Sequence, residues 1–154
     1  MIVEKGVKYT VESLDSVKLL KECDAGVKMA VSSFEDVLEN VCDSNMKELL
    51  QDSKVEHEKL GDEIHKLLNM CGAQEKDPNP MAVGMSWIKT NMKLAIDNCD
   101  ATVADLIIDG CNMGVKSLYK YLNQYENADQ ESKRLCKMLI NIEEKLCDEL
   151  KKYL

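Results

Sequence analysis

The residues of this chain that could do chemistry begin with its two histidines, His57 and His65, which both lie in the stretch 45–71. Apolar residues in that stretch recur in alternating steps of four and three, which is typical of a helix that packs in a bundle. The pattern places His57 within the apolar stripe and His65 well off it, where we expect it to be solvated with Asp62. A buried imidazole beside carboxylates can hold a metal ion, or it can donate a hydrogen bond as a core residue.

Three acids are predicted to lie in or beside the core near His57. Asp24 falls within the apolar stripe of the stretch 13–42, and Glu35 lies beside that stripe. Antiparallel pairing about the short turn brings Glu35 level with His57. The same reasoning places Glu143 level with Cys111. The predicted metal ligands, for iron or another divalent ion, are therefore His57, Glu35, Asp24 and Glu143.

A simpler interpretation of His57 needs no metal and no other cofactor, and we favour it. In this interpretation the imidazole is a core residue that is hydrogen-bonded to a carboxylate or to Ser53. The corresponding interpretation of Asp24 is a buried acid with one partner.

The seven cysteines are scattered along the chain, with no Cys-x-x-Cys pair and no zinc-finger spacing. We expect free thiols that act as small buried hydrophobic residues, as in a reducing compartment. The alternative is a thiol-based store for a soft metal such as Cu(I).

Helical periodicity extends over most of the chain and predicts an all-α protein. Residues 1–12 are expected to form an N-terminal arm, and residues 13–154 a single four-helix-bundle domain. Gly110 and Gly114 lie inside one helix, where we expect them to allow another helix to approach closely. The predicted helices span about 13–42, 45–71, 101–125 and 130–153, with a short helix at about 81–96.

Short polar turns join the first two and the last two of these helices, which predicts two antiparallel hairpins. The stretch between the hairpins is long and contains both prolines, so it is expected to cross the length of the bundle. Two hairpins joined by one long crossover is the topology of ferritin-like bundles.

Composition argues against several classes of function. The net charge of −8 disfavours nucleic acid and anionic membrane surfaces as partners. No apolar run approaches the ~20 residues of a membrane span, and the N-terminus lacks the apolar region of a signal peptide. We therefore expect a cytoplasmic protein that binds neither nucleic acid nor membrane.

The stretch from Met85 to Tyr121 resembles a group of small bacterial ferritin-like proteins of unknown function, in which a tryptophan-containing crossover helix precedes a helix with an acidic-Gly pair and a later aromatic residue. The corresponding residues here are Trp87, Asp109-Gly110, and Tyr119 or Tyr121. A similar Asp24-Ala-Gly26 follows in the first helix, and the resemblance covers roughly residues 14–150. It implies a ferritin-like four-helix bundle more than an activity.

Many ferritin-like proteins hold a di-iron centre through two glutamates and two Glu-x-x-His pairs. This chain has Lys54 three residues before His57, and its last two predicted helices contain no histidine. We therefore expect a non-catalytic cytoplasmic bundle that lacks a complete di-iron ligand set and acts through protein contacts, most simply as a homodimer. Apolar residues outside the core stripes favour such contacts, among them Leu106 and Met113. The alternatives are an altered carboxylate/His metal site and thiol-based metal storage.

Overall fold

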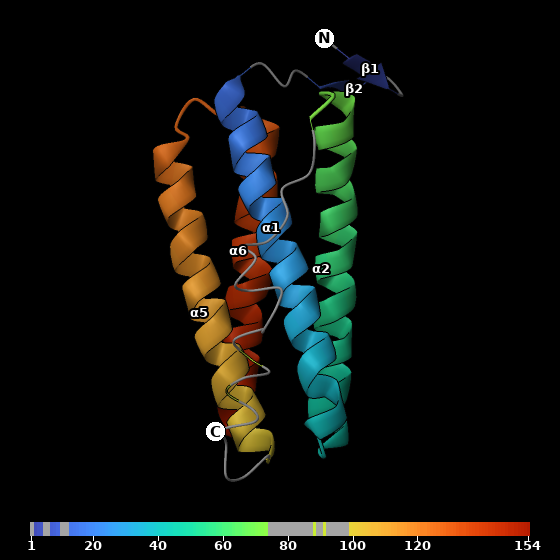
Figure 1. Ribbon diagram of the computed structural model, residues 1–154, viewed down its shortest axis with the longest axis vertical. Helices are drawn as coiled ribbons and strands as arrows, with labels where there is room; N and C mark the ends of the chain where they lie inside the picture. Colours follow the sequence, from blue (N-terminus) through green and yellow to red (C-terminus); the bar gives the residue numbers. More distant parts are fainter. Residues whose placement is uncertain (1, 5–6, 10–12, 74–87, 89–90, 92–98) are drawn as a thin grey trace.

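The computed structural model describes residues 2–4, 7–9, 13–73, 88, 91 and 99–154, and four long helices dominate this part of the chain. They form a bundle in which α1 contacts the other three helices (Figure 1). Short 3-10 turns, η1 and η2, extend α1 and α6. The helices are α1 (Leu14–Val37), α2 (Ser44–Met70), α5 (Asp100–Gln124) and α6 (Gln130–Leu150), with η1 at Leu38–Asn40 and η2 at Lys151–Tyr153.

Polar residues before the helices fix where three of them begin. The side chains of Ser13, Asp43 and Asp129 accept hydrogen bonds from backbone N–H groups in the first turns of α1, α2 and α6. Such caps satisfy donors that have no partner inside the helix. Asp43 caps α2 because its carboxylate accepts from the N–H of Met46 at 2.8 Å. At the other end of α2, Gly72 has a φ of 64°, which suits glycine after a helix.

The two hairpins are tied together at both ends of the bundle. The carboxylate of Asp100, at the start of α5, accepts from the backbone N–H groups of Cys42 and Asp43 at 2.7 and 2.9 Å. At the opposite end, Ser16 Oγ accepts from the backbone N–H of Asp129 at 2.8 Å. Helix α5 therefore begins at the end opposite to that where α2 finishes, as the predicted lengthwise crossover requires.

The predicted all-α bundle of two antiparallel hairpins with a long crossover is confirmed. The predicted crossover helix at 81–96 lies outside the described residues except at Ile88 and Asn91, which are both helical. Within the N-terminal arm, β1 (Ile2–Glu4) and β2 (Val7–Tyr9) pair antiparallel with Ile2 opposite Tyr9. No described helix is both long and apolar enough to cross a membrane.

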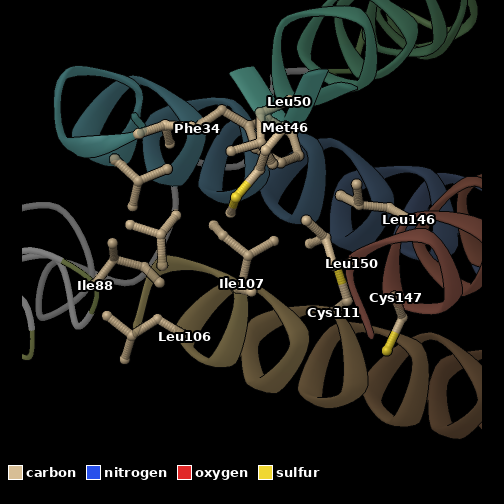
Figure 2. Packing of buried hydrophobic residues seen from close by; sticks show 14 residues of the cluster. Phe34, Met46, Leu50, Ile88, Leu106, Ile107, Cys111, Leu146, Cys147 and Leu150 are labelled. Atoms are coloured by element: carbon tan, nitrogen blue, oxygen red, sulfur yellow. The ribbon is translucent and has the colours of Figure 1, made fainter. Parts of the chain in front are cut away.

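The core consists of two apolar clusters stacked along the bundle. One lies near the α1–α2 turn and includes Phe34, Met46, Leu50 and Ile107, which Figure 2 shows pointing towards one another. Ile88, from the crossover, packs into this cluster with Leu106 of α5. Part of the apolar surface that α5 presents outside its core stripe is thus covered from within the same chain.

Candidate functional site in the bundle interior

His57 lies at the centre of the bundle with 1% of its surface exposed. Its Nδ1 atom is 2.7 Å from the backbone carbonyl oxygen of Ser53, one turn earlier in α2. A carbonyl oxygen only accepts, so Nδ1 carries a hydrogen and donates it. The edge of the ring faces Phe34 of α1, with 5.2 Å between ring centroids. These contacts fix the ring, and in the neutral imidazole they leave Nε2 as an unprotonated acceptor.

Glu143 of α6 faces that Nε2 atom and is itself 5% exposed. Its Oε1 atom is 3.9 Å from His57 Nε2, which is longer than a hydrogen bond. Burial raises the pKa of the Glu143 carboxyl, and the interaction with His57 partly offsets this rise. Within the described residues, His57 Nε2 and Glu143 Oε2 are buried without a hydrogen-bond partner.

Burial of the His57–Glu143 pair is least costly when the pair carries one proton in addition to the hydrogen on His57 Nδ1. An ionised Glu143 opposite a neutral His57 would place two acceptors face to face in a medium of low polarity. A proton on Glu143 removes this repulsion and leaves the pair without net charge, which lowers the cost of burying it.

A cavity of about 600 Å³ extends from this pair between α1 and α5. His57 and Glu143 line it together with Phe34, Ile107 and Cys111, so its walls are mostly apolar. Met29 and Met113 also line it, and they are 45% and 53% exposed.

Two glycines of α5 border the cavity, and at Gly114 the neighbour is a side chain rather than the closely approaching helix that we predicted from the sequence. A Cβ at Gly114 would overlap the Glu143 carboxylate, lying 3.1 Å from both its carboxyl carbon and Oε1. A Cβ at Gly110 would meet no atom of the described residues within 4 Å. Gly114 therefore makes room for a side chain from α6, and Gly110 lies in the lining of the cavity.

Asp24, a predicted ligand, lies in a separate polar group. It is fully buried and forms a hydrogen bond with His65 Nε2, and its other oxygen is 2.9 Å from Lys28 Nζ. The expected solvation of His65 with Asp62 is thus wrong, because the imidazole is long enough to reach from the edge of α2 to α1. Gly61 permits this close approach: a Cβ there would be 3.0 Å from Val27 Cγ1.

Glu35 does not approach His57, contrary to our expectation. Its side chain is 57% exposed, and its carboxylate is 2.9 Å from Lys54 Nζ. The hydrogen bond with Glu35 also raises the pKa of Lys54. Pairing at the surface avoids the desolvation cost that an ionised Glu35 would meet beside His57. Of the four predicted ligands, the structure brings His57 and Glu143 together and places Asp24 and Glu35 elsewhere.

All seven cysteines are free thiols. Cys23 and Cys136 share a hydrogen bond, which together with burial raises the pKa of Cys23. Burial and the neighbouring Glu143 raise the pKa of Cys111. Among the described residues, no three His, Cys, Asp or Glu side chains lie together as a set of metal ligands.

The two glycines give a matched test of where the Glu143 carboxylate lies. Gly110→Ala should stabilise the protein by up to about 1 kcal/mol through helix propensity. Gly114→Ala should destabilise it by about 1–3 kcal/mol, because the added methyl group displaces a buried carboxylate. Urea unfolding measures both changes, and equal stabilisation by the two substitutions would show that Glu143 does not lie against α5.

The raised pKa of Glu143 predicts a pH dependence of stability. A group whose pKa is higher in the folded state stabilises fully below its unfolded pKa and loses that effect as pH rises through the folded value. The stability of the wild type relative to Glu143→Gln should therefore fall as pH rises above about 4.5, the ordinary value, by at most about 1.4 kcal/mol per pH unit. Urea unfolding across this range measures the difference. Glu144→Gln, an exposed neighbour with the same charge change, is the control. A constant difference for Glu143→Gln would contradict the prediction.

Comparison with known proteins identifies the fold. No protein-family model and no curated protein matches the chain. Among solved structures, a DUF305 fragment from Deinococcus radiodurans aligns with a TM-score of 0.72 and 14% identity, over 91% of this chain and 95% of that one. Dps92 from the same organism aligns with a TM-score of 0.70 and 17% identity, over 91% and 86%. The chain therefore has the ferritin-like four-helix-bundle fold that the sequence resemblance implied.

Proposed function

We propose that this chain is a non-catalytic binding protein, and that it binds a small molecule in the cavity between α1 and α5. The observation that supports this most strongly is the pair His57–Glu143, two buried polar side chains that line a cavity of about 600 Å³ and each have an atom without a hydrogen-bond partner among the described residues.

The cavity has the size and character of a ligand site. Protein interiors are close-packed, and voids much larger than a water molecule are uncommon. Small-molecule sites typically enclose about 300–1,000 Å³ and combine apolar walls with a few placed polar groups. Here Phe34, Ile107 and Met29 supply apolar walls, and His57 and Glu143 supply the polar groups.

The described residues do not fit a di-iron centre. Such a centre needs several carboxylates and one imidazole per metal at one level of the bundle. At the level of His57 the core offers one carboxylate, Glu143. Asp24 is already bonded to His65 and Lys28, and Glu35 is bonded to Lys54 at the surface. This shortage of ligands favours binding over redox chemistry on iron.

An altered metal site is the alternative, favoured by the free His57 Nε2 and Glu143 Oε2 atoms. The two side chains would supply one nitrogen and one oxygen to a single divalent ion. In that case one ion should bind per chain, and His57→Ala should abolish its binding as well as lowering stability. If His57 serves only the cavity, His57→Ala should lower the stability of the protein without any change in its metal content.

Thiol-based metal storage has less support from the arrangement of the cysteines. A Cu(I) store needs several thiols that converge on one place. Cys23 lies with Cys136, Cys111 lies beside Glu143, and Cys42 is exposed on the turn between α1 and α2. Free thiols suit a reducing compartment, and we propose a cytoplasmic location on that basis.

Self-association is a second candidate function, favoured by two exposed methionines that line the cavity. Met29 of α1 and Met113 of α5 are apolar, mobile in rotamer and suited to a protein contact. We propose that a homodimer would use this face. A second copy seated there would also close the cavity.

Binding in the cavity predicts affinity for an uncharged apolar probe such as phenylbutanol. One molecule should bind per chain with a Kd of about 0.1–1 mM, as expected for a ligand of this size. Isothermal titration calorimetry measures it. Gly110→Leu should abolish binding by filling the cavity, whereas Asn123→Leu, exposed on the same helix, should bind as the wild type does. Absence of binding to the wild type would contradict the proposal.

The homodimer is tested by sedimentation velocity over a concentration series. A dimer on the α1–α5 face should dissociate when Met29 and Met113 are both replaced by Glu, because burying two carboxylates against a second copy is costly. Val55→Glu, at a 45% exposed position of α2, should leave the dimer intact. A wild type that remains monomeric at high concentration would exclude the dimer.

A further inference from the structure

We call His57 and Glu143 the floor of the cavity, and their spacing suits a single polar head group. His57 Nε2 and Glu143 Oε1 are 3.9 Å apart, which is too far for a direct hydrogen bond but less than twice the length of one. One atom placed between them can therefore be within hydrogen-bond distance of both. In its ionised form Glu143 only accepts, and the neutral His57 accepts through Nε2. A head group that donates two hydrogen bonds satisfies both atoms at once.

The charge around the floor favours a cation. Among the described residues that line the cavity, the carboxylates are Glu22 and Glu143, and the one lysine is Lys28, which is bound to Asp24. The whole chain carries a net charge of −8. An anion would meet two carboxylates here, whereas an ammonium group would meet an acid that it can neutralise.

Three thiols, on α1, α5 and α6, lie close enough to Glu143 for its carboxylate to act on them. They are Cys23 of α1, Cys111 of α5 and Cys136 of α6. Burial raises the pKa of Cys111, and the hydrogen bond with Cys136 and burial raise the pKa of Cys23, so these two remain uncharged. His57 is then the titratable group that acts on Glu143.

From this juxtaposition we propose that the cavity binds an organic ammonium ion, with an apolar body between α1 and α5 and its N–H groups donating to Glu143 and His57. This inference rests on the proposed small-molecule site and names the class of its ligand. Before binding, Glu143 carries a proton and the pair is neutral. When the ammonium ion enters, Glu143 becomes a carboxylate, its proton leaves to solvent, and His57 keeps only its Nδ1 hydrogen. The cation thus takes the place of one proton, and the buried site remains neutral.

Three probes with the same body and different heads test the inference: phenylbutylammonium, phenylbutanol and phenylbutyrate. At neutral pH, calorimetry should show the ammonium binding the wild type at least about tenfold more tightly than the alcohol, and the carboxylate binding most weakly. Repeating the titration in buffers of different ionisation enthalpy should show about one proton released per ammonium bound, and none for the alcohol.

Variants of α6 assign the effect to Glu143. Glu143→Gln should lower the affinity for the ammonium by about 10–100-fold, change that for the alcohol by less than about threefold and abolish proton release. Glu144→Gln, an exposed neighbour with the same charge change, should behave as the wild type. If Glu143→Gln does not fold, the head-group preference and proton release of the wild type decide the question on their own.

The failures of the two proposals can be told apart. Equal binding of the ammonium and the alcohol, or ammonium binding without proton release, would overturn the ammonium assignment and leave the small-molecule site standing. No binding of any of the three probes would overturn both.

Discussion

The central constraint on this structure is that the carboxyl group of Glu143 is buried inside a helical bundle. Glu143 is 5% exposed and faces an imidazole that is 1% exposed, and an uncompensated charge there would cost several kcal/mol. The hydrogen bond from His57 Nδ1 to the Ser53 carbonyl orients the ring so that Nε2 faces Glu143. A proton on Glu143, which its burial favours, then keeps the pair neutral. Gly114 provides the space in which the carboxylate lies.

Contacts elsewhere in the bundle allow the cavity beside His57 and Glu143 to remain. Asp100 ties the start of α5 to the α1–α2 turn, and Ser16 ties α1 to the start of α6. The apolar clusters stack along the bundle, and the cavity draws its lining from both, with Phe34 from one and Leu118 from the other. Because the helices are tied together at both ends and packed along their length, the bundle can retain a cavity that a close-packed interior would otherwise fill.

Periodicity predicted the helices, the hairpins and the lengthwise crossover, because burial of an apolar stripe repeats every three or four residues. It also placed His57 inside and put Glu143 in the core. It did not predict that His65 reaches Asp24, because position on a helix does not specify how far a long side chain extends around its edge. The prediction that Glu35 approaches His57 was wrong for a related reason: a residue beside the stripe can turn inward or outward, and Lys54 holds Glu35 at the surface. The glycines were visible in the sequence, but whether Gly114 faces a helix or a side chain depends on the three-dimensional packing.

The measurement that tests the account most directly is the metal content of the protein, purified without a metal-binding tag, after anaerobic incubation with Fe(II). An interior organised by a neutral acid–imidazole pair predicts no stoichiometric iron, because at the level of His57 the described residues supply one carboxylate and one imidazole, whereas a di-iron centre needs about four carboxylates and two imidazoles. Two tightly held irons per chain would contradict the account and would make this bundle a redox protein.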